Sequence, residues 1–191
     1  MHHFFAYMAR MRHIFRWGLM RNTFPENDQE HALQAAMIAH ALAILRNTRH
    51  GGAVNADHVA ALALYHDAGE VITGDLATPI KHFNPAVHQA FDRMEALARD
   101  RLLGMLPEDL RPALTPYLRP DEDSEAWRIV KAADRLCAYL KCVEELKAGN
   151  GEFAKAREAI AKDIAALELP EVQDFMREFA PSFELSLDEL N

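Results

Sequence analysis

Apolar residues recur every three or four positions along most of the chain, and no stretch alternates like a half-buried strand. Residues that commonly cap the start of a helix precede four of these stretches: Asn27, Asn55, Asn84 and Ser124. We therefore predict long helices over residues 28–46, 56–70, 85–104, 125–148, 152–167 and 170–179.

Shorter helical segments complete the pattern. The first 25 residues contain no acid and are rich in aromatic residues, which predicts a first helix buried on its aromatic side. Pro107 and Ser186 each begin a short helical turn. With 191 residues and a predominance of strong helix formers, the chain is predicted to be all-α. Residues 1–191 would form one compact domain, with the core at about 28–148 and the terminal helices packed on it. In the 85–104 helix, the predicted core residues are Phe91, Met94, Leu97 and Ala98.

Polar side chains occupy helix positions where the pattern predicts core. His66 and Asp67 continue the apolar stripe of the 56–70 helix, and Glu70 lies one turn further along the same face. His31 and Asp134 lie on the inward faces of two other predicted helices. A buried carboxylate is costly unless it is paired, and one metal ion shared by two imidazoles and two carboxylates would remove that cost. We predict that His31, His66, Asp67 and Asp134 bind one divalent transition-metal ion.

Each of these residues also has a purely structural interpretation. A histidine on an apolar face is more often a hydrogen-bonded core residue than a ligand. Asp134 could instead pair with an arginine such as Arg135. The His-Asp dipeptide is not specific by itself, but the order of His31, His66-Asp67 and Asp134 on three separate predicted helices favours the metal site.

Composition and charge restrict the partners. The net charge of −8 argues against a nucleic-acid polymer, whose phosphates require a basic face, whereas one or two cations suffice for a single nucleotide. No stretch is long and apolar enough to span a membrane. The two cysteines, Cys137 and Cys142, are predicted to point to different faces of one helix, so they form no local disulfide. Reduced cysteines favour a cytoplasmic protein.

The order of these residues and their flanking sequences resemble the HD-domain metal phosphohydrolases, and within them the bacterial 5′-deoxynucleotidase (YfbR-type) family. The similarity covers almost the whole chain. The matching stretches are FRWGLMRNT (15–23), EHALQAAMIAHALA (30–43), ALYHDAGEVITGDLATPIKHFN (63–84), KAADRLCAYLKCVEELKAGN (131–150) and PSFELSLDEL (181–190).

The resemblance implies an HD-domain fold and the hydrolysis of 2′-deoxyribonucleoside 5′-monophosphates to deoxynucleosides and phosphate by a homodimer. It implies that Glu70 is catalytic, and Arg16 is expected to grip the phosphate with its planar guanidinium. Trp17 would exclude a 2′-hydroxyl. Cobalt is favoured among Co, Mn, Zn, Cu and Ni as the single metal ion. The residues expected to contact substrate are Arg16, Trp17, His31, Asp67, Asp75, Leu76, Ala77, Thr78 and Asp134.

Other interpretations remain open at this level. Ala77 stands where the family's GDLPTP loop has a proline, and residues 75–79 could be only a turn. Trp17 could be a core residue and Arg16 a surface charge. An HD phosphohydrolase that acts on nucleoside triphosphates or alarmones would need more cations, for which the motifs offer only Lys81 and Arg135. A non-catalytic helical module with a structural metal is a further alternative, against which Glu70 argues because the metal does not need it as a ligand.

Overall fold

The capping residues predicted from the sequence begin four helices of the computed structural model, which describes residues 1–81 and 83–190. In each case a side-chain oxygen accepts a hydrogen bond from a backbone N–H of the first turn, an interaction worth about 1 kcal/mol. Asn27 caps α2 (Asp28–Arg49), Asn55 caps α3 (Ala56–Tyr65), Asn84 caps α6 (Pro85–Gly104) and Ser124 caps α8 (Glu125–Lys147).

Shorter helices connect and flank these four. The described residues form no β-strand, and Phe15 and Asn27 are joined by an isolated antiparallel β-bridge. The all-α prediction is confirmed, and none of the described helices has the length and hydropathy needed to cross a bilayer. The remaining elements are α1 (Phe4–Met8), η1 (Ala9–His13), α4 (Glu70–Thr73), α5 (Thr78–Lys81), α7 (Arg111–Leu118), η2 (Gly151–Phe153), α9 (Ala154–Ala165), α10 (Pro170–Glu178), η3 (Ala180–Glu184) and η4 (Leu187–Leu190).

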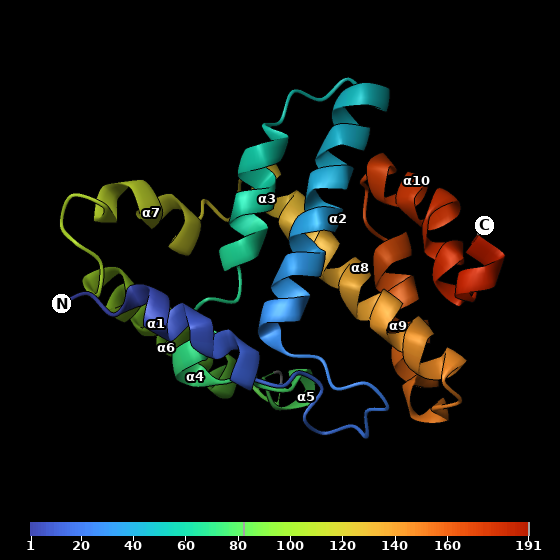
Figure 1. Cartoon of the computed structure of the whole chain (residues 1–191), viewed down its shortest axis with the longest axis horizontal. Coiled ribbons are helices and arrows are strands. Elements are labelled where there is room, and N and C mark those ends of the chain that lie inside the picture. The colour runs from blue at the N-terminus through green and yellow to red at the C-terminus, as the bar shows by residue number, and fades with distance from the viewer. Residues whose placement is uncertain (82, 191) are drawn as a thin grey trace.

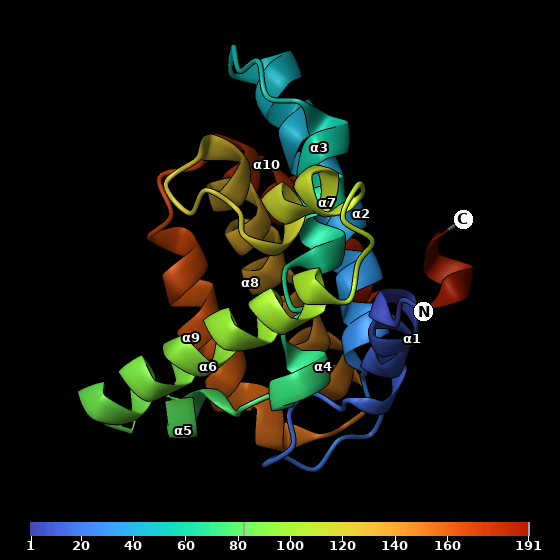
Figure 2. The same ribbon diagram turned by 90° about the vertical axis from the view of Figure 1, so that its left-hand side faces the viewer.

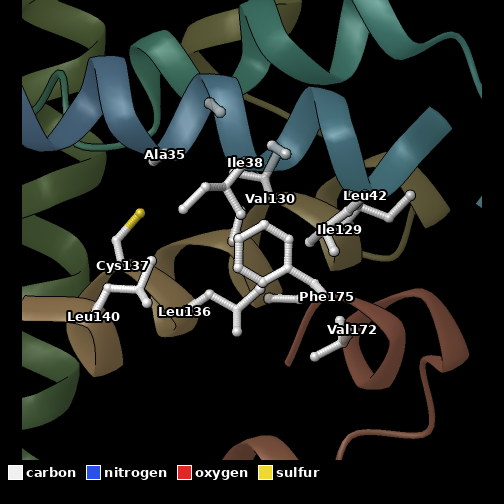
Figure 3. Close-up of a cluster of buried hydrophobic side chains, with 14 of the residues drawn as sticks. Ala35, Ile38, Leu42, Ile129, Val130, Leu136, Cys137, Leu140, Val172 and Phe175 are labelled. Carbon is white, nitrogen blue, oxygen red and sulfur yellow. The ribbon is translucent and has the colours of Figure 1, made fainter. Parts of the chain in front are cut away.

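The main core lies between α2, α3 and α8, which cross at the centre of the molecule (Figure 1). Ile38 and Leu42 of α2 meet Ile129 and Val130 of α8, and Phe175 of α10 closes the cluster (Figure 3). Because α2 and α8 present their buried faces to each other, polar residues on those faces near one end of the helices come together there.

A smaller apolar cluster joins α1, α6 and α7 to the turn after α3. Phe4 is 1% exposed in this cluster whereas Phe5 is 65% exposed, so the expected burial of the first helix holds for one aromatic side chain and fails for its neighbour. Figure 2 shows the N-terminal half of α6 extending from the helical body beside α5.

The prediction of one helix over 56–70 is wrong, because α3 ends at Tyr65. The ring of His66 bonds through Nδ1 to the carbonyl of Ala63 at 2.7 Å, so it occupies the acceptor that the amide of Asp67 would use in a continuing helix. Residues 66–69 form turns, and Ala68 is buried in the smaller cluster. Glu70 therefore begins a separate helix, α4, rather than ending α3.

Two other local predictions are corrected. In α6, Phe91 and Ala98 are buried as predicted, but Met94 and Leu97 are 43% and 68% exposed. The extended helix buries only a narrow stripe, and these two side chains lie outside it. The helical turn expected at Pro107 begins later, as α7 at Arg111, because Pro107 to Leu110 form a turn first.

Candidate metal centre and active site

His66 is held in the orientation of a metal ligand. Its Nδ1 donates to the carbonyl of Ala63 at 2.7 Å, which leaves a lone pair on Nε2. Nε2 is buried and has no hydrogen-bond partner in the described part of the chain. His31 lies on α2, and its Nε2 is likewise buried without a hydrogen-bond partner among the described residues. The ring centroids of His31 and His66 are 5.2 Å apart.

Carboxylates complete this cluster. The ligand atoms of His31, His66 and Asp134 all lie within 4.8 Å of one another, although they come from α2, the turn after α3, and α8. Asp134 Oδ1 is 3.1 Å from His31 Nε2, and Asp67 Oδ2 is 3.0 Å from His66 Nε2. Two orphaned imidazole nitrogens beside two carboxylates are a donor set that fits a divalent transition metal. The four predicted ligands are thus adjacent in space.

Arg16 lies directly against this cluster. Its Nη1 donates to Asp67 Oδ2 at 3.1 Å, and its Nη2 is 3.9 Å from Asp134 Oδ1. The side chain is only 14% exposed, so the interpretation of Arg16 as a surface charge is wrong. The alternative pairing of Asp134 with Arg135 is also wrong, because Arg135 lies 3.3 Å from Asp163 and Asp134 faces the cluster.

Trp17 has an unusual backbone and an anchored ring. Its φ of 60° lies in the left-handed region, which costs a non-glycine residue about 1–3 kcal/mol. Its ring centroid lies 5.3 Å from that of Phe153, and its Nε1 donates to Glu26 Oε2 at 3.2 Å. The indole is therefore half-buried at the edge of the main core, next to Arg16.

Glu70 shares its surroundings with a second acid, Asp28. Burial first, and then the charges of Asp67, Asp28 and Asp75, raise the pKa of Glu70 to about 11. Burial is also the main cause that raises the pKa of Asp28 to about 6, and each of these two carboxyl groups shifts the pKa of the other. Both oxygens of Asp28 and Oε2 of Glu70 are buried without a hydrogen-bond partner among the described residues.

The loop after α4 contributes Asp75 to the site. Burial raises the pKa of Asp75, and the backbone of Trp17 lies near enough to its carboxylate to oppose that shift. Leu76 and Ala77 follow half-buried, and Thr78 is exposed at the start of α5. The structure thus brings Asp75 to the Arg16-Trp17 segment, while the substrate contacts predicted for the next three residues stay predictions.

Three residues near the cluster were missed by the sequence reasoning: Glu26, Asp28 and Lys131. Glu26 lies in an irregular segment where periodicity carries no information. Asp28 follows a helix cap, where an acid is common for local reasons. Lys131, whose Nζ is 3.3 Å from Asp134 Oδ2, lies one turn before Asp134 in α8, so helical spacing could have indicated it.

Comparison with known proteins agrees with this geometry. The profile of the YfbR-like 5′-deoxynucleotidase family matches residues 3–183. A 5′-deoxynucleotidase of Vibrio vulnificus is 50% identical over 190 residues, which cover 99% of this chain and 98% of the relative. A 5′-deoxynucleotidase of Klebsiella pneumoniae is also 50% identical, over 99% of this chain and 96% of its own length.

Solved structures share the fold at lower identity. An HD-domain phosphohydrolase of Listeria innocua matches with a TM-score of 0.83 and 20% identity, over 94% of this chain and 87% of that one. The HD phosphohydrolase of cyanophage S-2L, solved with dA and one catalytic Zn²⁺ ion, matches with a TM-score of 0.63 and 22% identity, over 94% and 95% of the two chains. With a match over nearly its full length to the profile and to close relatives, this chain belongs to the YfbR-like 5′-deoxynucleotidase family.

Proposed function

We propose that this protein is a metal-dependent phosphomonoesterase that hydrolyses 2′-deoxyribonucleoside 5′-monophosphates to deoxynucleosides and phosphate. The observation that carries the proposal is the position of Arg16, whose guanidinium lies against the carboxylates of a His–His–Asp–Asp cluster. A buried cation beside a metal-ligand set suits a phosphate monoester, which needs charge neutralisation at phosphorus. The relatives at 50% identity are named for the same activity.

His31, His66, Asp67 and Asp134 would hold the metal ion. Such an ion lowers the pKa of bound water and polarises a phosphoryl oxygen. The resemblance favours cobalt, and the cyanophage relative contains Zn²⁺. The choice is tested by loading the metal-free protein with Co²⁺, Mn²⁺, Zn²⁺, Cu²⁺ or Ni²⁺ and comparing turnover.

We infer that Glu70 acts as a general acid. In the metal-free protein, burial raises the pKa of this carboxyl to about 11, and a carboxyl that holds its proton can donate it to the 5′-oxygen that leaves with the deoxynucleoside. Arg16 would bind the phosphate with its planar fork. Trp17, anchored at both its ring and its Nε1, would form a rigid wall where a 2′-hydroxyl would lie, with Asp75 on the same side.

The decisive experiment measures phosphate release with added metal from dAMP, AMP, dATP and an alarmone. A deoxynucleotidase prefers dAMP. A triphosphatase or alarmone hydrolase would prefer the larger substrates. Lys81 is paired with Glu95 at 3.1 Å and Arg135 with Asp163 at 3.3 Å, so neither is aimed at the cluster, whereas Lys131 lies beside it at 3.3 Å from Asp134 Oδ2. A non-catalytic module would release no phosphate from any of the four.

We also propose a cytoplasmic homodimer with no nucleic-acid polymer and no membrane as partner. Two reduced cysteines and the acidic charge support the location and the partner class. Exposed Leu33, Met37 and Ile44 lie along one side of α2 and would be covered by a second copy. Light scattering should give twice 21.6 kDa for the protein and a lower mass for Met37→Glu.

A further inference from the structure

Glu26 lies in the segment between η1 and α2 and faces three donors of the candidate site. Its Oε2 accepts a hydrogen bond from Nε1 of Trp17 at 3.2 Å and lies 3.4 Å from Nε of Arg16. Its Oε1 lies 3.7 Å from Nδ1 of His31. The side chain is 13% exposed, so one largely buried carboxylate contacts residues proposed to bind phosphate, sugar and metal.

Two of these donors depend on Glu26. Nε of Arg16 and Nδ1 of His31 are buried, and neither has a full hydrogen bond to any described residue. A buried N–H without an acceptor is strongly unfavourable. The carboxylate of Glu26 faces both of these nitrogens. Removal of this carboxylate would therefore leave Nε of Arg16 and Nδ1 of His31 without a facing acceptor, although Asp67 and Asp134 still lie beside other nitrogens of the same two side chains.

The backbone of the same residue supports the segment as well. The N–H of Arg16 donates to the carbonyl of Glu26 at 2.9 Å, and the N–H of Asp28 donates to the carbonyl of Ile14 at 3.0 Å. These two bonds close the segment that carries Trp17, whose left-handed backbone persists only where its surroundings hold it. Glu26 therefore closes the base of the loop through its backbone and contacts the side chains of Arg16 and Trp17 through its carboxylate.

We propose that Glu26 is a positioning residue that orients His31 toward the metal and holds the indole of Trp17 against the sugar. The proposal rests on the metal and substrate roles proposed above. A carboxylate 3.7 Å from Nδ1 favours the proton on that nitrogen, which keeps the lone pair of His31 on Nε2, the nitrogen that faces His66 and Asp134. The contact with Nε1 of Trp17 prevents the ring from turning away from the sugar.

The test compares Glu26→Gln with Glu26→Ala and with the unmutated protein. Glutamine keeps the shape but loses the charge and one acceptor oxygen. A calorimetric titration of the metal-free protein with Co²⁺ should show a Co²⁺ affinity about 10- to 100-fold weaker in both variants than in the unmutated protein. The ratio of kcat/KM for dAMP to that for AMP should fall in Glu26→Gln and in Trp17→Phe, which lacks the N–H. In the double variant Glu26→Gln/Trp17→Phe, the ratio should fall no further than in the single variant with the larger fall, because the two changes remove the same contact.

Glu152→Gln is the matched control. Glu152 holds Arg21 of the same segment at 3.1 Å, so its removal loosens the segment without touching the site. This variant should keep the Co²⁺ affinity and the substrate ratio. The proposal is wrong if Glu26→Gln keeps the Co²⁺ affinity, or if Glu152→Gln weakens it equally. Should the unmutated protein fail to hydrolyse dAMP, the proposed function would be lost, while the Co²⁺ titration would still decide the role of Glu26.

Discussion

Arg16 donates a hydrogen bond from Nη1 to Oδ2 of Asp67 at 3.1 Å, between residues that are 51 positions apart in the chain. The same oxygen lies 3.0 Å from Nε2 of His66. The carboxylate of Asp67, a proposed metal ligand, is therefore shared by a proposed phosphate-binding cation and a second proposed metal ligand. A metal ion held by Asp67 would compete with Arg16 for this oxygen.

Replacement of Arg16 by lysine should lower kcat/KM for dAMP by about 10²-fold or more, because an ammonium lacks the planar fork that binds two phosphoryl oxygens. Steady-state phosphate release measures the effect. Arg135→Lys, which changes a cation paired with Asp163 outside the cluster, should leave kcat/KM unchanged. Normal kcat/KM in Arg16→Lys would show that Arg16 does not bind the phosphate.

Removal of any proposed ligand should abolish metal binding and phosphatase activity together, since each of His31, His66, Asp67 and Asp134 is one of few donors. Asp134→Ala is the most direct variant. Metal content after dialysis, measured by elemental analysis, is compared with that of Asp163→Ala, whose carboxylate is exposed and pairs with Arg135. Full metal content and turnover in Asp134→Ala would refute the site.

Glu70→Gln should bind metal and nucleotide but turn over about 10²–10⁴-fold more slowly, the usual contribution of a proton-transfer group. Calorimetry gives both binding constants, and a single-turnover assay gives the rate. Glu95→Gln, which alters a carboxylate paired with Lys81, should turn over normally. A kcat near that of the unmutated protein would remove Glu70 from the mechanism.

Trp17→Ala should narrow the preference for dAMP over AMP chiefly by admitting AMP, because an apolar wall excludes a hydroxyl only while it is rigid and leaves no space. The two values of kcat/KM are measured at one fixed metal concentration. Equal rates for dAMP and AMP on the unmutated protein would contradict the deoxynucleotide preference. An unchanged ratio in the variant would contradict only the role of Trp17.

The metal-free protein should become less stable as the pH rises from 7 to 10. Burial lowers the pKa of His66, but Asp67 and Asp134 outweigh it and raise the pKa from 6.5 to about 10. The stability that protonated His66 contributes is complete below its unfolded value of 6.5 and is lost as the pH rises through about 10. Glu70 acts in the same direction, because burial raises its pKa from 4.5 to about 11 and its ionisation is penalised in the folded state.

Glu70→Gln separates these two contributions. Its Tm, followed by circular dichroism in chelator at several pH values, should fall less steeply between pH 7 and 10 than that of the unmutated protein. Parallel slopes would show that Glu70 ionises in the folded chain as readily as in the unfolded one. Metal loading should flatten both curves, since a bound cation replaces the proton on His66.

Local patterns in the sequence determined the helices and the composition of the site. Asn27, Asn55, Asn84 and Ser124 act on amide groups within three residues of themselves, so the start of a helix can be recognised from its neighbours alone. The inward His and Asp positions could be predicted for a related reason. A charged side chain that is buried between helices without a partner is strongly unfavourable, so a charged residue at a core position indicates that a partner is present.

The end of α3 and the side chains around the cluster depend on contacts between distant parts of the chain. The helical pattern continues through Glu70, but Nδ1 of His66 donates a hydrogen bond to the carbonyl of Ala63. Ala68 packs in the smaller apolar cluster with α1, α6 and α7. Glu26 carries no periodic signal, and its three contacts depend on how an irregular segment closes over α2. Such contacts depend on the packing of elements that are distant in the chain, which no local pattern of residues contains.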